Sequence, residues 1–321
     1  MTMQIKSLEE PLSKAAILLG TASLFAALIP ISLAPSLVKL CEREIGANAV
    51  AFHRNWIATI IFALLTAIEF FRRSDSDRQT LEKKPFTRWE WGLLLVMGTS
   101  GATYFILWVW SVTKTSIANV TLLSNLNPLF VGLAGYFLLG RRFDNRFAIG
   151  MIMAMLGAIA FEVNKVQFGS NQILGDGLAF LTAIFIATYL MLVERLRNRF
   201  TTANIMLCRC GITTMFLLPI LPITEDRLFP YSGMGWFFII FQALFCQVLG
   251  QGLLAYSLSK LSSGVVAVTL LLEPVLASIF AWFIFSEQVS LFGWMTFAVV
   301  LFGIYLAQSS QSGVKETKEE S

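Results

Sequence analysis

Residues 269–278 read TLLLEPVLAS, which places Glu273 and Pro274 inside a long apolar run. If this run crosses a membrane as a helix, Glu273 lies close to its midpoint. An ionised carboxylate at the centre of a bilayer costs about 2.5 to 3.5 kcal/mol on insertion scales, and a proline leaves a carbonyl one turn earlier without its helical partner. The stretch therefore predicts a membrane helix that breaks at a polar site, where water, a cation or a proton relieves the charge.

The rest of the chain is similarly apolar. Of its 321 residues, 56% are hydrophobic and only 14% are charged, and the mean hydropathy is +0.70. A helix needs about 20 apolar residues to cross the hydrocarbon core, and no connection between the apolar runs is long enough for a soluble domain. We predict an all-α membrane protein with ten transmembrane helices, at residues 15–38, 48–71, 89–111, 116–139, 144–162, 175–193, 202–222, 233–256, 263–285 and 289–307.

Two long stretches of the chain align with each other without a gap. They are WSVTKTSIANVTLLSNLNPLFVGLAGYFLLG at residues 110–140 and YSLSKLSSGVVAVTLLLEPVLASIFAWFIFS at residues 256–286. The alignment matches Pro128 with Pro274 and pairs a lysine in each preceding turn. At a slightly different offset FHRNWIATI aligns with LCRCGITTM, which matches Arg54 with Arg209. The sequence therefore predicts an internal repeat.

Each predicted repeat holds five spans. Because five is odd, the second repeat enters the membrane from the opposite face, and a pseudo-two-fold axis in the membrane plane relates the two. Inverted repeats of this kind let one scaffold adopt two mirror-related states that open to opposite sides. The predicted organisation is a first repeat at residues 15–162, a linker at 163–174, a second repeat at 175–308 and a cytoplasmic tail at 309–321.

The basic residues predict the orientation in the membrane. Lysine and arginine are enriched in short cytoplasmic loops, and ten spans place both termini on one side. With the N-terminus inside, the basic residues that fall outside are Lys39, Arg43, Lys114, Lys165 and Arg227. This bias predicts that both termini are cytoplasmic, and it explains the formal net charge of +4 without a nucleic-acid partner.

Polar residues near the midplane are the candidates for a central site. Asn127 lies at the same depth in its span as Glu273 in its own, and Pro128 and Pro274 are predicted helix breaks. We predict that Glu273 and Asn127 bind a substrate or a coupling ion. The alternative is that Glu273 is protonated and bonded to a neighbouring helix, where it fixes a kink.

Two arginines lie inside predicted spans, on opposite sides of the midplane. Either Arg54 or Arg209 could bind an anionic group of a substrate. Equally, each could extend to the lipid headgroups or pair with an acidic side chain.

Three stripes of polar residues follow helical spacing, so that the members of each stripe share one helix face. They comprise Thr121, Ser124, Asn125 and Pro128 in the fourth span, Ser100, Thr103 and Tyr104 in the third, and Gln247 and Gln251 in the eighth. The stripes could line a polar cavity, although membrane bundles also use such residues for hydrogen bonds between helices.

No metal or cofactor site is predicted. His53 is the single histidine of the sequence, and no second type of ligand lies near it along the chain. Cys41 falls in a predicted loop, while Cys208, Cys210 and Cys246 fall in apolar spans, where a thiol behaves as a small hydrophobe.

These residues also carry a resemblance to a known family. The stretch LLLEPVLASIFAWFIFSEQVSLFGWMTFAVVLFGIYL at 270–306, with Glu273-Pro274, Glu287 and Gly303 in order, resembles the second repeat of the EamA family of the drug/metabolite transporter superfamily. SIANVTLLSNLNPLFVGLAGYFLLG at 116–140 resembles its first repeat, with Pro128 followed by Gly150 and Gly157. Arg54 stands where the family often has an arginine. The resemblance covers nearly all of residues 15–308.

Two features depart from the family pattern. Arg141 stands where the first repeat of the family usually carries a glutamate, and the Trp-Gly pair common in the first span is missing around Phe25 to Ala27. The resemblance implies a ten-helix carrier, usually of bacterial inner membranes, that moves amino acids, other metabolites or drugs, often outward. The departures put in doubt any transfer of a substrate from one relative to this chain.

We predict a secondary active transporter that moves a small polar metabolite, such as an amino acid or a related compound, by alternating access. Its partners are this substrate, membrane lipids and a proton or ion as candidate coupling species. A membrane enzyme would need paired acids, a serine with a base, or clustered histidines, and the spans offer none of these sets. A non-transporting scaffold or sensor, or a channel, is the alternative. The sequence indicates neither the substrate, the direction, the coupling ion nor the oligomeric state.

Overall fold

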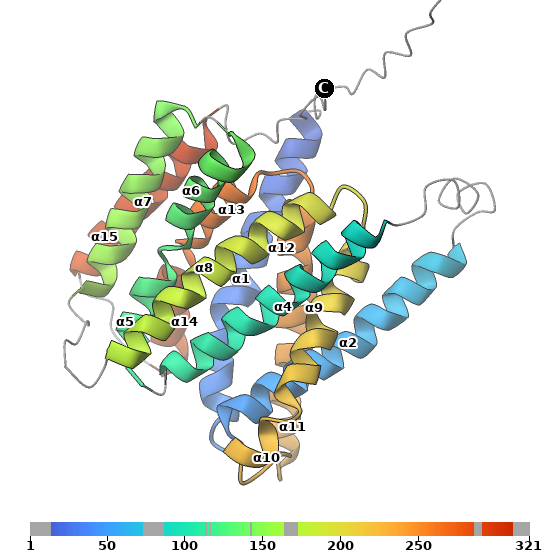
Figure 1. Ribbon diagram of the computed structural model, residues 1–321. Coiled ribbons are helices and arrows are strands. Elements are labelled where there is room, and N and C mark those ends of the chain that lie inside the picture. Colours follow the sequence, from blue (N-terminus) through green and yellow to red (C-terminus); the bar gives the residue numbers. More distant parts are fainter. Residues whose placement is uncertain are drawn as a thin grey trace, which may run out of the picture.

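The computed structural model describes residues 14–72, 87–112, 114–115, 117–141, 143–163, 173–285 and 291–310. The regular elements of these residues are helices, arranged as one bundle (Figure 1). In chain order they are α1 (Lys14–Cys41), α2 (Ala47–Arg72), α4 (Arg88–Val112), α5 (Ile117–Ser124), α6 (Asn127–Leu139), α7 (Asn145–Val163), α8 (Ile173–Leu196), α9 (Thr202–Leu217), α10 (Leu221–Thr224), α11 (Gly233–Phe241), the π-helix η2 (Gln242–Gln251), α12 (Gly252–Ser257), α13 (Ser263–Leu270), α14 (Glu273–Phe285) and α15 (Leu291–Gln308).

Within the described residues, eight helical segments are long and apolar enough to cross a membrane. Two further predicted spans, 144–162 and 202–222, are occupied by the shorter apolar helices α7 and α9. α9 ends at Leu217, shortly before Pro219, which has no N–H to continue the helical hydrogen bonds. The all-α, multi-pass character is confirmed, whereas the ten-helix, two-repeat arrangement stays a prediction.

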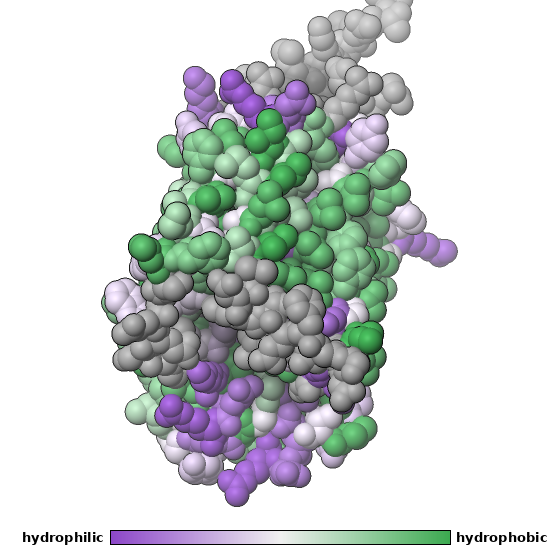
Figure 2. Space-filling view, turned by 90° about the vertical axis from the view of Figure 1, so that its left-hand side faces the viewer, coloured by the Kyte–Doolittle hydropathy of each residue, from purple (hydrophilic) through white to green (hydrophobic). Residues whose placement is uncertain are grey.

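The surface of the bundle has the character of a membrane protein. Many large apolar side chains are exposed, Phe71, Phe137, Leu138 and Leu291 among the most. On the side of α7 and α15, Figure 2 shows an apolar zone, in green, between two hydrophilic ends. Water-soluble monomers rarely expose apolar patches of this size, so this zone fits contact with lipid.

Both ends of the described chain lie at the same end of the bundle. α1 begins and α15 ends at the top of Figure 1, while α10 and α11 lie at the bottom. We refer to these two ends as the termini face and the opposite face. The predicted placement of the termini face in the cytoplasm stays a prediction.

Packing between the helices follows a consistent pattern. α4 packs along α8, and α1 packs in a comparable way along the segment α11–η2–α12. α2 packs against α9, and α7 packs against α15. The helices α2, α4, α9 and η2 therefore surround one region in the middle of the bundle.

The α7 and α15 pair is fixed by two glycines. A Cβ atom at Gly150 would lie 2.4 Å from the backbone nitrogen of Ala307, and one at Gly303 would lie 2.4 Å from the backbone nitrogen of Ala154. Backbones this close leave no room for sliding, because any shift forces main-chain atoms together. We therefore regard α7 and α15 as one rigid unit.

Two pairs of helices are separated by short breaks. α5 ends at Ser124 and α6 begins at Asn127, while α13 ends at Leu270 and α14 begins at Glu273. Pro128 and Pro274, the second residues of α6 and α14, cannot donate a backbone hydrogen bond. The breaks place Asn127 and Glu273 at the first position of the second half-helix in each case.

Candidate functional site

Arg54 projects from α2 into the middle of the bundle. Its Nε donates a hydrogen bond to Oε1 of Gln247 at 2.7 Å, and its guanidinium carbon lies 6.0 Å from the centroid of the Phe105 ring. The Arg54 side chain is surrounded by other parts of the chain and is nevertheless partly exposed. Part of the Arg54 side chain is therefore left uncovered by the rest of the protein.

Arg209 lies on the neighbouring helix α9 and is only 3% exposed. One terminal nitrogen donates to Oε1 of Gln251 at 3.0 Å, and the other donates to the hydroxyl of Tyr104. The guanidinium carbon lies 5.4 Å from the centroid of the Tyr104 ring and 4.9 Å from that of the Tyr189 ring. Two hydrogen bonds and two cation–π contacts thus stabilise this buried cation.

A glycine in α4 makes room for Arg209. A Cβ atom at Gly101 would lie 3.0 Å from Cγ of Arg209 and 3.3 Å from Cδ2 of Tyr189. An alanine at position 101 would therefore force the arginine or the Tyr189 ring to shift slightly.

The two glutamines that hold the arginines come from a π-helix, where the sequence predicts an ordinary membrane helix. η2 contains Gln247 and Gln251, and Nε2 of Gln247 also lies 3.3 Å from Sγ of Cys210 and 3.5 Å from Oδ1 of Asn55. Four residues are nearly one full turn of a π-helix, so both amides still point the same way. π-helices occur frequently at functional sites.

Glu273 lies at the start of α14, enclosed by other parts of the chain yet partly exposed. Arg54 is close enough to act on it electrostatically. Within the described residues the two charges do not form an ion pair, and the carboxylate of Glu273 accepts no direct hydrogen bond. The bundle therefore holds a carboxylate and a guanidinium near one another with part of their binding capacity unused.

The break between α5 and α6 holds a second set of polar side chains. Asn127 is 5% exposed and Ser124 is 7% exposed, and Nδ2 of Asn127 donates to the carbonyl oxygen of Ser124 at 3.0 Å. Oδ1 of Asn127, Oγ of Ser124 and Nδ2 of Asn125 are buried without a hydrogen-bond partner. Buried polar atoms normally have partners, so these three atoms fit a site that a water molecule or a polar ligand group completes.

The structure brings most of the predicted site residues together. Arg54 bonds to Gln247, and Arg209 bonds to Gln251 and Tyr104. Both glutamines come from η2, and Arg54 acts electrostatically on Glu273. Ser124, Asn125 and Asn127 form a separate set that packs against α8.

Sequence reasoning missed three residues that contact the two arginines. They are Tyr189, Phe105 and Gly101. An aromatic or a glycine within an apolar run gives no local signal of contact with a charge. A search for aromatic residues near the depth of each arginine would have proposed the first two.

His53, the histidine considered as a metal ligand, is engaged in hydrogen bonds within the protein. His53 is buried, with Nε2 2.7 Å from the carbonyl oxygen of Leu228 and Nδ1 accepting from Nε1 of Trp56 at 2.8 Å. Nε2 therefore joins α2 to the loop before α11, while Nδ1 is engaged by a side chain of α2 itself. The described part of the chain contains no group of three metal-ligating side chains.

The sequence matches the profile of a known transporter family twice, at residues 13–161 and again at residues 173–308. The chain belongs to the EamA-like transporter family. The predicted family resemblance is thereby confirmed, and with it the assignment to transporters rather than to a class of enzymes. Glu287, which also carried the resemblance, lies outside the described residues.

Relatives of this EamA-like protein cover most of the chain at low identity. The pseudopaline exporter of Pseudomonas aeruginosa is 24% identical over 276 residues, which are 86% of this chain and 89% of the exporter. An uncharacterized transporter of Archaeoglobus fulgidus is 24% identical over 284 residues, 85% of this chain and 92% of that protein. The uncharacterized transporter YetK of Bacillus subtilis is 25% identical over 223 residues, 67% of each chain.

A protein of known crystal structure has a similar fold. It superposes with a TM-score of 0.70 over 92% of this chain and 98% of its own length, at 17% identity. At this identity the likeness concerns the fold alone.

Proposed function

We propose that this EamA-like protein is a secondary active transporter that exports a small polar metabolite, such as an amino acid or a related compound, across the cytoplasmic membrane by alternating access. The substrate binds near the middle of the bundle, between Arg54 and Glu273. Both termini lie in the cytoplasm, and a proton or another ion is the candidate coupling species.

One observation carries the proposal. Arg54 and Glu273 are enclosed in the bundle and partly exposed, and they interact electrostatically without forming an ion pair within the described residues. Charges at membrane depth are costly and mark pathways for substrates and ions. A purely structural pair would be expected to close on itself, because an unpaired charge in this environment is destabilising.

The two charges match a substrate that carries both signs. Nε of Arg54 is engaged by Gln247, which orients the guanidinium and leaves its terminal nitrogens for a carboxylate, a geometry that arginine binds well. The carboxylate of Glu273 would receive a protonated amine or, between substrates, a proton. An amino acid or a related compound presents both groups, and Phe105 beside Arg54 offers an apolar surface.

The internal repeat supports alternating access. The family profile matches each half of the chain separately, and the contacts of α4 with α8 have a counterpart in those of α1 with α11–η2–α12. Each half also contains one helix that breaks before a proline. These features favour two inverted five-helix repeats around a central site, and the excess of basic residues on the termini side favours a cytoplasmic location of that face.

Reconstitution provides the test. Metabolites in cells and medium would first be compared with and without expression, and the compound that changes would then be loaded into liposomes containing the purified protein. We expect saturable flux that unlabelled substrate on the far side accelerates, because a carrier exchanges while a channel does not. An absence of flux for every such compound would favour a scaffold or sensor.

Two substitutions test the site within this assay. Glu273→Gln and Asn127→Ala should reduce flux while expression stays normal. A hydrogen bond to a charged group contributes about 1.5–3 kcal/mol, so the Glu273 variant should lose about 10- to 100-fold in transport efficiency. Arg43→Gln, in the exposed loop after α1, is the matched control and should transport normally. Normal transport by both site variants would show that the site has been placed wrongly.

A further inference from the structure

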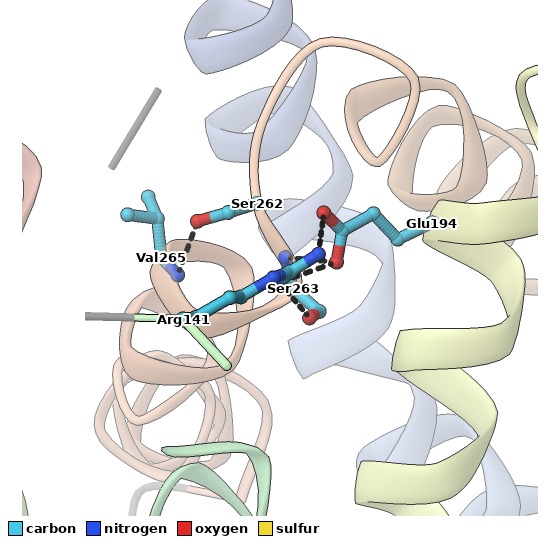
Figure 3. A network of polar contacts seen from close by, with 5 residues as sticks. All are labelled: Arg141, Glu194, Ser262, Ser263 and Val265. Carbon is cyan, nitrogen blue, oxygen red and sulfur yellow. Dashed lines mark hydrogen bonds and ion pairs between the residues drawn. The ribbon is translucent and has the colours of Figure 1, made fainter. Parts of the chain in front are cut away.

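Three side chains meet at the termini face, where α6, α8 and α13 come together (Figure 3). Arg141 follows Gly140, whose left-handed conformation (φ 61°) ends α6. Glu194 lies in the last turn of α8, and Ser263 is the first residue of α13. The cluster thus joins the ends of two broken helices, one from each half of the chain, through a third helix.

The contacts within this cluster are specific. Terminal nitrogens of Arg141 donate to Oε1 and Oε2 of Glu194 at 2.8 and 3.1 Å, and the backbone N–H of Ser263 donates to Oε2 of Glu194 at 3.0 Å. Arg141 also lies 3.5 Å from Oγ of Ser263. The carboxylate sits at the N-terminus of α13, which favours a negative charge.

An apolar layer lies beside the polar cluster. The rings of Phe143 and Phe147 stack with their centroids 4.8 Å apart, and Phe147 and Val265 belong to one buried apolar cluster. Gly264 lets α13 approach this layer, because a Cβ atom there would lie 3.0 Å from Cζ of Phe147. Polar contacts and apolar packing therefore meet around the start of α13.

The polar cluster is partly accessible to solvent through Arg141. Glu194 is 2% exposed, but the side chain of Arg141 is 28% exposed, so water already reaches the pair from one side. When α6 and α8 part, both charges can enter water together, and neither is left buried and unpaired. The α7–α15 unit at the same face is different, because its backbones interlock through Gly150 and Gly303.

From this contrast we propose that Arg141, Glu194 and Ser263 form a gate that closes the termini face and must part once in every transport cycle. The proposal rests on the proposed function, since a gate has meaning only if a substrate passes. It also gives a role to Arg141, the residue that departs from the family pattern: its positive charge complements the carboxylate that α8 presents.

Cross-linking tests the gate. In proteoliposomes, the double variant Arg141→Cys, Glu194→Cys is treated with a short bifunctional thiol reagent that a reductant cleaves. We expect flux to stop on cross-linking and to return on reduction. The matched control is Asp144→Cys, Ser310→Cys, which replaces a hydrogen bond of 2.6 Å at the same face between the start of α7 and the end of α15. This cross-link joins parts of one rigid unit and should leave flux intact.

A second measurement covers the case in which the double variant transports poorly. A cysteine replacing the buried Val265 is labelled from the termini side with a polar thiol reagent, with and without Arg141→Gln. A partly exposed ion pair contributes modestly, so labelling should rise roughly 2- to 5-fold when the pair is removed.

Full flux through the cross-linked gate, or labelling at residue 265 that does not respond to Arg141→Gln, would overturn the proposal. Failure of the proposed function has a different signature, because unmodified protein in liposomes would then show no flux at all.

Discussion

Arg54 and Arg209, which the predicted repeat aligns with each other, have different surroundings. Arg209 is buried between two tyrosine rings and is bonded to Gln251 and Tyr104. Arg54 donates a hydrogen bond to Gln247, lies beside the ring of Phe105 and has a partly exposed side chain. The difference suggests a division of roles, in which Arg209 stabilises the bundle and Arg54 is free to bind a substrate.

The largest effect is expected from Arg209→Gln. Its removal leaves a pocket shaped for a cation between Tyr104 and Tyr189, and it removes the donors to Gln251 and Tyr104. Each buried polar group that loses its partner costs about 1–3 kcal/mol, and both Gln251 and Tyr104 lose one. Thermal unfolding in detergent should therefore show a strongly reduced stability, or the protein should fail to accumulate. Wild-type stability would contradict the structural role of Arg209.

Arg54→Gln should impair transport rather than stability. We expect stability close to that of the wild type and a loss of about 10- to 100-fold in transport efficiency, since a hydrogen bond to a charged group contributes about 1.5–3 kcal/mol. Flux and thermal unfolding would be measured on the same preparation. If the variant unfolds as easily as Arg209→Gln, the proposed division between the two arginines is wrong.

Gly101→Ala sharpens the comparison without removing a charge. The added methyl group would lie 3.0 Å from Cγ of Arg209, and overpacking of this kind typically costs about 1–3 kcal/mol. Gly92→Ala in the same helix is the control, because a Cβ atom there meets nothing within 4 Å. Thermal unfolding should separate the two variants, and equal stabilities would show that Arg209 is free to shift.

The smallest effects are expected from the two glutamines. Gln251→Leu removes a partner of Arg209 and should lower stability by about 1–3 kcal/mol, because a buried donor is left unsatisfied. Gln247→Leu should chiefly raise the substrate concentration at half-maximal flux, because Arg54 loses the bond that orients it. The two variants can be compared by flux titration and thermal unfolding. If Gln247→Leu lowers stability and Gln251→Leu alters the half-saturating substrate concentration, the roles assigned to the two arginines are reversed.

Part of the candidate site could be predicted from the sequence. Charged and amide side chains inside apolar runs stand out because their burial is costly, which identified Arg54, Arg209, Glu273, Asn127, Gln247 and Gln251. The partners of these groups could not be predicted in the same way. Tyr189 and Phe105 are ordinary members of apolar helices, and Glu194 lies near a helix end where a charged residue attracts no notice.

By itself the sequence determined that the chain is apolar enough to cross a membrane repeatedly, and that polar residues and prolines recur near the middle of two matched stretches. These are properties of composition and spacing, and they follow from the cost of placing polar groups in lipid. Only the tertiary structure decided that Arg209 is buried while Arg54 is partly exposed. It also decided that a π-helix supplies both glutamines and that Arg141 pairs with Glu194. Such contacts join residues far apart in the chain, so they depend on how the helices pack.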